Sequence, residues 1–142
     1  MSLHGTYDSD NIFAKIIRGD MPAVKVFEDD QVLAFMDVFP QSRGHMLVIS
    51  KTSKARNLLE IAPADLARML AVAARIGQAQ IDGLGAGGFT IVQNNGVGQS
   101  VPHLHIHVIP RVAGKPLDFN ENKIGDPADI EAVAVKLRAA LK

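Results

Sequence analysis

The sequence predicts a single α+β domain, built as a five-stranded antiparallel sheet with helices packed on one face. Five short segments have the alternating or apolar character of strands, and most connections between them are short. One long amphipathic segment, 63–82, crosses between the third and the fourth of these strands and supplies a helix to cover the sheet. At 142 residues, the chain is long enough to bury one ordinary core.

The N-terminal half is predicted to hold one short helix and three strands. Asp10 can cap a helix over about 11–18, and Gly19 can end it. Three strands are expected after this helix, over 24–29, 32–38 and 45–50.

The C-terminal half begins with the long helix, which has Pro63 in its first turn and is expected to end at Gly83. Its apolar face is predicted to consist of Leu66, Met69, Leu70, Ala73 and Ile76. Strands are expected at 89–93 and 103–110, and a last helix from Asp126 and Pro127. The segment 112–126 is polar and irregular.

Composition excludes several classes of protein. Lysine plus arginine and aspartate plus glutamate number 15 each, so the chain lacks the net basic character that binding to nucleic acid normally requires. The absence of cysteine excludes disulfides, thiolate zinc sites and thiol nucleophiles. No secretory signal is visible, and no apolar run approaches the roughly 20 residues of a membrane span. We therefore expect a cytoplasmic protein with no membrane or nucleic-acid partner.

Three of the five histidines alternate along one predicted strand, in the run "GQSVPHLHIHVIPR". They are His103, His105 and His107. Successive side chains of a strand point to opposite faces, so Leu104, Ile106 and Val108 are expected to face the core. The imidazoles are then expected to project together from the other face. The apolar residues explain why the strand folds, but they do not explain the imidazoles.

Three interpretations follow from the residues alone. The histidines could lie on a solvated face, although Thr, Lys or Glu would serve such a face equally well. They could bind zinc with His45 or Asp37, but no carboxylate that would orient a ligating imidazole is identifiable. They could instead act as nucleophile and acid–base groups on phosphorus, because imidazole titrates near neutrality. We favour the last, since the loop "NNGVGQS" places amide and hydroxyl donors, including Gln99 and Ser100, beside the strand.

The histidine run resembles the signature of the histidine triad (HIT) superfamily, His-x-His-x-His followed by an apolar residue. A separate block, "IFAKIIRGDMPAVKVFEDDQVLAFMDVFPQSRGHMLVISK", resembles the Hint branch and the bacterial HIT proteins. The resemblance covers about residues 11–111, and it therefore implies a single domain with a core over 11–111 and a C-terminal extension over 112–142. The resemblance implies a two-layer α+β protomer that dimerises by extending its sheet, binds purine nucleotides and cleaves at the α-phosphorus. It implies no cofactor.

The resemblance also implies roles for individual residues. His105 would be the nucleophile that becomes nucleotidylated, and His107 would contact the scissile phosphate or the leaving group. His103 and His45 would orient the centre, and Asp37 would accept the ribose hydroxyls. The base pocket would comprise Ile12, Phe13, Ile16, Phe35 and Val38, which also fit ordinary core packing. The phosphate would be held by Asn94, Gln99 and Ser100.

The chain departs from the family pattern in three places. Asn11 and Ala14 stand where many bacterial relatives carry a Cys-x-x-Cys pair that helps to hold a structural zinc, so we expect no metal. The loop "NNGVGQS" is about two residues shorter than the usual pattern. Segment 112–142 resembles the Hint C-terminus poorly, and in Hint proteins that end helps to select the substrate across the dimer.

The leading hypothesis is therefore a hydrolase of purine nucleoside 5′-phosphoramidates or related adenylates. Its alternatives are a dinucleoside polyphosphate hydrolase of the Fhit type, a nucleotide-binding or scaffold protein with weak turnover, and a metal hydrolase. The intact triad favours an enzyme over a purely binding role. A polyphosphate leaving group needs neutralising cations, and only Arg111 and Lys115 lie near the motif, so the phosphoramidate is preferred.

Overall fold

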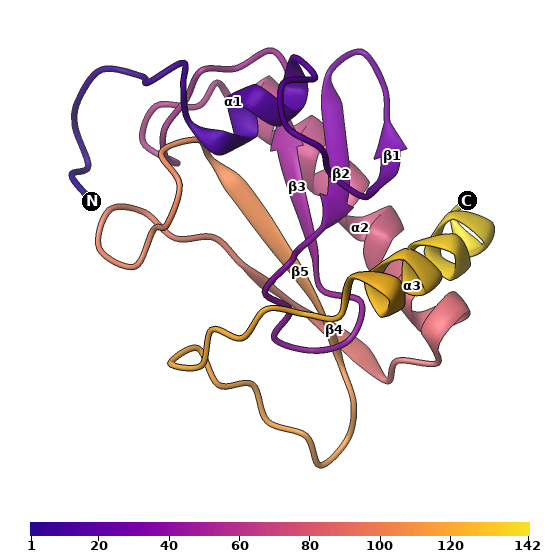
Figure 1. The fold of residues 1–142 in the computed structure, drawn as a ribbon. Coiled ribbons are helices and arrows are strands. Elements are labelled where there is room, and N and C mark those ends of the chain that lie inside the picture. The colour runs from indigo at the N-terminus through magenta and orange to yellow at the C-terminus, as the bar shows by residue number, and fades with distance from the viewer.

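Five strands form one antiparallel sheet in the order β1-β2-β3-β5-β4 in the computed structural model, which describes all residues 1–142 (Figure 1). The strands are β1 (Lys25–Glu28), β2 (Val32–Met36), β3 (Met46–Ser50), β4 (Gly88–Val92) and β5 (His105–Arg111). Three helices accompany them, α1 (Ile12–Ile17), α2 (Pro63–Leu84) and α3 (Pro127–Ala140). The predicted five-stranded α+β fold is confirmed.

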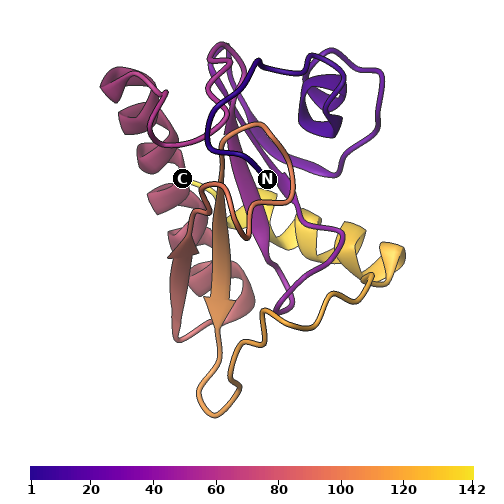
Figure 2. The same ribbon diagram turned by 90° about the vertical axis from the view of Figure 1, so that its left-hand side faces the viewer.

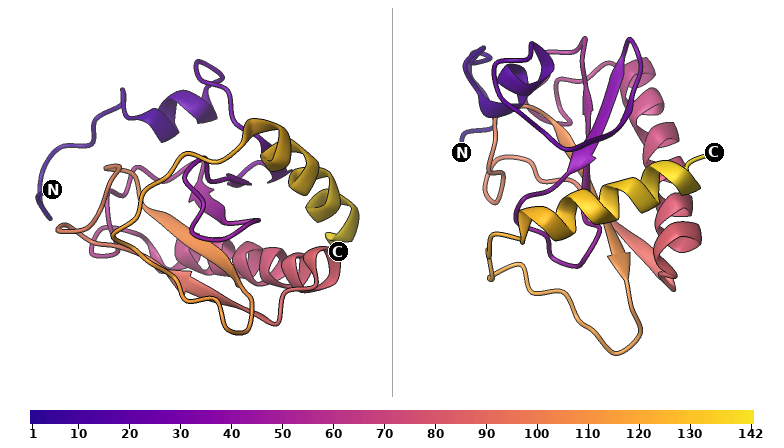
Figure 3. Two further views of the ribbon diagram at one scale, coloured as in Figure 1. Left: turned by 60° about the horizontal axis from the view of Figure 1, so that its bottom comes forward. Right: turned by 45° about the vertical axis from the view of Figure 1, so that its right-hand side comes forward.

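The two long helices, α2 and α3, cover the same face of the sheet, and the short α1 lies on the other face (Figures 2 and 3). Alternation along the strands accounts for both layers. In β2, Val32 and Ala34 join the core under α2 and α3, whereas Leu33 and Phe35 pack with α1. The strand β2 is therefore buried on both sides. None of the three helices combines the length and the apolar character that crossing a membrane requires.

The ends of α1 and α2 differ from those expected. Asn11, and not Asp10, caps α1: its Oδ1 accepts a hydrogen bond from the backbone N–H of Ala14 at 2.9 Å. Helix α2 continues through Gly83 and ends before Gly85, which has a left-handed φ of 68°. A Cβ on Gly83 would lie 3.0 Å from the backbone oxygen of Lys136 in α3. Gly83 thus permits a close approach of two helices and does not end one.

The buried face of α2 is rotated slightly from the predicted one. Met69, Ala73 and Ile76 are buried as expected, but Leu70 is 45% exposed and Val72 is buried in its place. Helix α3 begins where expected, with Asp126 as its N-cap. Its buried residues are Ile130, Val133, Ala134 and Leu137, which pack on α2 and the sheet.

One buried side chain of α2 fixes the two segments that carry histidines. Gln80 is fully buried, and its Nε2 donates to the Gly44 oxygen at 3.0 Å and to the Val108 oxygen at 2.9 Å. Gly44 precedes His45, and Val108 follows His107. A buried amide that joins two backbone carbonyls holds the start of β3 against β5.

Gly44 should be the glycine in this part of the fold that is least tolerant of substitution. Its φ is 97°, and a Cβ there would fall on Leu84 Cδ1 and lie 3.3 Å from Pro110 Cγ. We expect Gly44→Ala to lower the free energy of unfolding by about 2 kcal/mol, from backbone strain together with packing. Urea denaturation measures the change. Gly114→Ala is the matched control, since φ is 79° there and a Cβ would meet nothing within 4 Å. Equal losses in the two variants would contradict a contribution from packing.

Candidate active site

Two antiparallel strands bring the histidines together. In the β3–β5 pair, His105 lies opposite Ile49 and His107 lies opposite Leu47, both of which face the α1 side of the sheet. His45 comes immediately before β3. On the other side of β5, Leu104, Ile106 and Val108 are buried under α2 and α3, as the alternation predicted.

His105 is held in one tautomer by a backbone carbonyl. Its Nδ1 lies 2.8 Å from the oxygen of His103, and because a carbonyl oxygen can only accept, Nδ1 carries the proton. The lone pair of His105 is therefore on Nε2. The side chain is 3% exposed, and burial lowers the pKa of His105, so the ring is neutral at pH 7. The Phe13 and His105 rings meet edge to face, with ring centroids 4.9 Å apart.

His45 and His107 form a directed hydrogen-bonded pair. The backbone N–H of Gln41 donates to His45 Nδ1 at 2.9 Å, so the proton of His45 is on Nε2. That Nε2 lies 2.9 Å from His107 Nδ1 and donates to it, which leaves the proton of His107 on its Nε2. Burial lowers the pKa of His45 to about 3 and that of His107 to about 4. Both rings are neutral at pH 7, and His107 presents an N–H donor.

His103 has a different environment from the other two triad residues. It lies two residues before β5, is 2% exposed, and is absent from the lining of the cavity described below. Its Nε2 donates to the Ser50 oxygen at 3.1 Å, and its Nδ1 accepts from the Tyr7 hydroxyl at 2.7 Å. The three imidazoles therefore do not project into one space. His103 lies outside the cavity, and its backbone oxygen accepts from His105 Nδ1.

A cavity of about 710 Å³ lies beside His45, His105 and His107. All five residues predicted for the base pocket line it, namely Ile12, Phe13, Ile16, Phe35 and Val38. Asn94 and Ser100 also line it. Gln99 does not: it is buried, and its Nε2 donates to the Arg56 oxygen at 2.6 Å and the Val101 oxygen at 2.9 Å. Gln99 thus stabilises the loop before β5 through buried hydrogen bonds.

Asp37 follows the end of β2 and borders the same cavity. Its Oδ1 accepts from the backbone N–H of Phe39 at 2.8 Å, and its Oδ2 lies 3.4 Å from His45 Nε2. Burial raises the pKa of Asp37 to about 6, so the carboxylate is mostly ionised at pH 7. The side chain thus presents acceptor oxygens beside the cavity, which suits a pair of hydroxyl donors.

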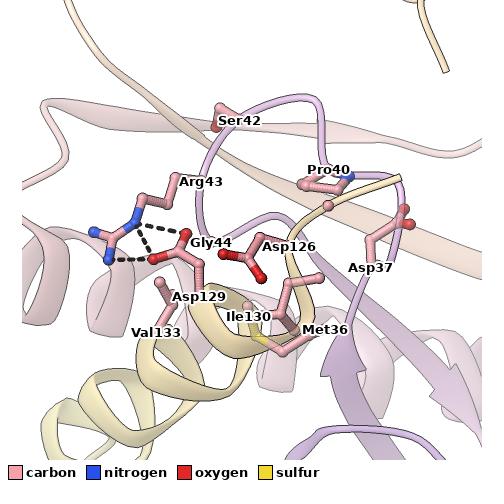
Figure 4. Close-up of a pocket in the computed structure, with 11 residues that line it drawn as sticks. Met36, Asp37, Pro40, Ser42, Arg43, Gly44, Asp126, Asp129, Ile130 and Val133 are labelled. Carbon is pink, nitrogen blue, oxygen red and sulfur yellow. Dashed lines mark hydrogen bonds and ion pairs between the residues drawn. The ribbon is translucent and has the colours of Figure 1, made fainter. Parts of the chain in front are cut away.

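A smaller cavity of about 190 Å³ adjoins Asp37 on its other side, between the loop before β3 and the start of α3 (Figure 4). Its one basic side chain, Arg43, donates to both carboxylate oxygens of Asp129 at 2.8–3.1 Å. Figure 4 shows this ion pair directed away from Asp37. The charge of Arg43 is therefore neutralised by Asp129 within the small cavity, and Arg43 does not line the large one.

The segment after β5 returns along the large cavity. Phe119, Glu121 and Asn122 line that cavity. The Gln41 side chain fixes them, because its Nε2 donates to the Glu121 oxygen and its Oε1 accepts from the Asp118 N–H, both at 3.1 Å. We call residues 118–122 the return segment. The sequence gives no signal for these residues, because nothing in an irregular polar stretch indicates where it docks.

The cavity contains carboxylates but no basic side chain. Its ionisable lining residues other than histidine are Asp37, Glu121 and Glu131, and no lysine or arginine lines it. Arg111, one of the two cations near the motif, instead donates from Nη1 to Thr90 Oγ1 on β4. The local field disfavours a ligand that brings many negative charges beyond a single phosphate group.

Asp37, His45 and His107 are the one group that could offer three metal-ligand atoms, which lie within 4.8 Å of one another. Two imidazoles and a carboxylate with an open position are a donor set that suits zinc. The tautomer opposes it: the Gln41 N–H on Nδ1 keeps a proton on His45 Nε2, which is the atom that would have to ligate. His45 and His107 are therefore arranged to bond to each other and not to a metal ion.

An open five-stranded antiparallel sheet that sets alternating histidines beside a cavity defines a histidine triad protein. The chain belongs to the HIT family, since the HIT domain model matches residues 18–114.

Relatives in this family include named enzymes. The chain is 38% identical over 102 residues to the adenosine 5′-monophosphoramidase of Schizosaccharomyces pombe, covering 70% of this chain and 73% of that protein. It is 40% identical over 108 residues to an adenylylsulfatase of Arabidopsis thaliana, covering 75% of this chain and 54% of that protein. These relatives support nucleotide hydrolase activity at the level of the family.

Solved structures share the whole fold. A Hit-like protein involved in cell-cycle regulation from Bartonella henselae is 42% identical with a TM-score of 0.89, covering 96% of this chain and all of that one. A Zn-bound histidine triad family protein from Mycobacterium smegmatis is 40% identical with a TM-score of 0.83, covering 92% of each chain.

We expect this protein to require no metal for folding or activity. Asn11 Oδ1 accepts from the backbone N–H of Ala14, and Asn11 Nδ2 donates to the Asp8 oxygen at 2.7 Å. The side chain of Ala14 has no atom that could bind a metal, so neither residue replaces a cysteine ligand. Elemental analysis should find less than stoichiometric zinc, and excess chelator should leave both the melting temperature and turnover unchanged. Stoichiometric zinc, with loss of folding or activity in chelator, would overturn this expectation.

Proposed function

We propose that this protein is a purine nucleotide hydrolase that cleaves at the α-phosphorus of nucleoside 5′-phosphoramidates or related adenylates. One observation carries the proposal: the His103 carbonyl fixes the proton of His105 on Nδ1, which leaves a neutral Nε2 lone pair as a nucleophile beside the cavity. The names of the two enzymatic relatives support the same substrate class.

The reaction proceeds in two displacements at phosphorus. His105 Nε2 attacks the α-phosphorus, a nucleotidyl–His105 bond forms, and the P–N bond to the amine breaks. His107 Nε2–H donates a proton to the departing nitrogen, and His45 supports this transfer through its bond to His107 Nδ1. Water then attacks the same phosphorus and gives a proton to His107 Nε2, which restores the proton lost in the first step. The P–N bond to His105 breaks, and the nucleoside monophosphate is released.

The remaining assignments concern binding. Asp37 accepts the two ribose hydroxyls, and the apolar wall receives the purine. Asn94 and Ser100 donate to the phosphoryl oxygens. The apolar wall consists of Ile12, Phe13, Ile16, Phe35 and Val38. A cavity of about 710 Å³ with an apolar majority and a few convergent polar groups has the size and character of a small-molecule site.

A substrate panel separates this function from its alternatives. Wild-type protein is incubated with an adenosine 5′-phosphoramidate, an adenylate with an acyl or sulfate leaving group, a diadenosine polyphosphate and a nucleotide sugar, and nucleoside monophosphate release is measured. Turnover of the first two supports the proposal. Turnover of the diadenosine polyphosphate alone indicates the Fhit-like function, and nucleotide binding with no turnover of any member indicates a binding or scaffold protein.

We expect a homodimer that extends the sheet through β4. This strand is at the end of the sheet, and its side chains Phe89 and Ile91 are 37% and 41% exposed. Unpaired backbone groups beside exposed apolar side chains favour pairing with a second copy. Light scattering at micromolar concentration should give a dimer mass, and Ile91→Lys should shift it toward monomer. Val135→Lys, at an exposed position on α3, is the control. A monomeric wild type would contradict the expectation.

Cytoplasmic location stays a prediction from the sequence.

A further inference from the structure

Tyr7 makes a contact with the triad that no feature of the proposed site accounts for. Its hydroxyl lies 2.7 Å from His103 Nδ1, and the two rings meet edge to face with centroids 5.7 Å apart. Tyr7 is the only tyrosine of the chain and lies 96 residues before its partner. Neither residue lines the cavity, so the contact does not serve substrate binding.

The His103 ring is bonded at both of its nitrogens, and the two bonds require one tautomer. The Ser50 backbone oxygen at 3.1 Å can only accept, so His103 Nε2 carries the proton. Nδ1 then holds the lone pair, and the Tyr7 hydroxyl is its donor. Burial lowers the pKa of His103 to about 4, so the ring stays neutral and needs that external donor.

The same residue fixes the proposed nucleophile through its backbone. The His103 carbonyl accepts from His105 Nδ1 at 2.8 Å, and the next N–H, of Leu104, donates to the Ala55 oxygen at 3.0 Å. The His103 ring is held by its bonds to Tyr7 and Ser50 and packs at right angles to the Phe13 ring. A displaced ring would move this peptide, because the ring and the carbonyl belong to one residue. Loss of the Tyr7 hydroxyl would therefore act on His105 in two steps: the His103 ring shifts, and the His103 carbonyl then loosens its hold on His105 Nδ1.

Tyr7 belongs to a segment that is itself anchored. The buried Asn57 side chain donates to the Leu3 oxygen at 2.7 Å, and Arg56 Nη2 donates to the Ser2 oxygen at 3.2 Å. Figure 2 shows this N-terminal segment passing in front of the turn that leads into β5. The bond to His103 is thus part of a fixed arrangement of the N-terminal segment.

We propose that Tyr7 is a positioning residue for the nucleotidyl-transfer step, holding His103 so that its carbonyl keeps His105 in the attacking tautomer. This inference rests on the proposed function. Because Tyr7 and His103 are outside the cavity, the loss of the Tyr7 hydroxyl should affect the chemical step and not substrate binding.

The test is Tyr7→Phe, which keeps the ring and removes the hydroxyl. With an adenosine 5′-phosphoramidate, we expect kcat to fall about tenfold, the factor that one ordinary hydrogen bond contributes, and KM to stay within about twofold. Ser42→Ala is the matched control: it removes the hydroxyl that donates to the Pro110 oxygen near the other end of β5, and kcat should not change. Both variants are assayed well below their melting temperatures.

Nitrogen-15 NMR of histidine-labelled protein supplies the readout that a purely structural role would not move. In the wild type, His105 should show a protonated Nδ1 and an unprotonated Nε2. In Tyr7→Phe, these two His105 signals should move toward a mixture of tautomers, whereas the Ser50 oxygen keeps the proton of His103 on Nε2. An unchanged His105 tautomer, an unchanged kcat, or a raised KM at constant kcat in Tyr7→Phe would each overturn the inference. A wild type that turns over no substrate refutes the proposed function, whereas the NMR comparison still tests the hold of Tyr7 on His103.

Discussion

Replacing His105 with alanine should lower turnover at least about 1,000-fold while nucleotide affinity stays within about threefold of the wild type. The reason is a division of labour in the proposed site. Asp37 and the apolar wall bind the nucleoside. Only His105 presents an unprotonated imidazole nitrogen to the phosphorus, because the Nε2 of His107 carries a proton. Losing a covalent nucleophile removes one of the two displacements outright.

The measurement combines steady-state kinetics with calorimetric binding of a nucleoside monophosphate. Because His105 is buried, His105→Asn is the companion variant, since its side-chain amide can still donate to the His103 carbonyl. His4→Ala removes an exposed histidine outside the site and should leave kcat unchanged. Mass spectrometry after acid-free quenching should find a nucleotidyl adduct on His105. Full activity in either His105 variant, or an adduct on another residue, would exclude the assignment.

Adenosine 5′-phosphoramidate should be cleaved with a kcat/KM about 100-fold higher than that of a diadenosine polyphosphate. The cavity is lined by three carboxylates and by no lysine or arginine, and Arg43 and Arg111 are bonded elsewhere. A polyphosphate leaving group adds two to three unfavourable charge contacts of roughly 1 kcal/mol each. An amine leaving group adds none and receives the proton of His107.

The return segment allows this explanation to be tested at one residue. Glu121→Gln removes one carboxylate from the cavity lining without changing its size, and it releases Lys123, whose Nζ lies 3.3 Å from Glu121 Oε1. Both changes should raise kcat/KM for the diadenosine polyphosphate alone and so reduce the preference for the phosphoramidate. Glu60→Gln is an exposed control outside the cavity. Faster cleavage of the diadenosine polyphosphate by the wild type would instead favour the Fhit-like function.

Periodicity predicted the elements of the fold and the buried side of β5, because strand alternation and helix amphipathicity are local properties. The burial of Leu104, Ile106 and Val108 is the clearest example. The prediction that the long helix ends at Gly83 was wrong, because a glycine that lets two helices approach has the same local sequence as one that ends a helix. The contact that decides between those two uses comes from Lys136 in α3, 53 residues further along the chain.

The histidines of the candidate site could be predicted as a set, but their individual environments could not. Alternation places His103, His105 and His107 on one side, yet the strand starts only at His105, and His103 turns toward Tyr7. Gln41 and the return segment carry no sequence signal, because their positions depend on where distant loops meet. Gln99 was expected to hold a ligand, and instead its amide satisfies buried carbonyls.

Gln41 has two separate roles: its backbone acts on the histidines, and its side chain positions the return segment. Its backbone N–H sets the proton on His45, and its side chain fastens the return segment. Every amino acid except proline offers that N–H. A substitution at this position can therefore re-route the return segment and remodel the wall that a substrate meets, while the imidazole pair keeps its proton order. The fold thus contains a site where substrate range can evolve without rebuilding the catalytic centre.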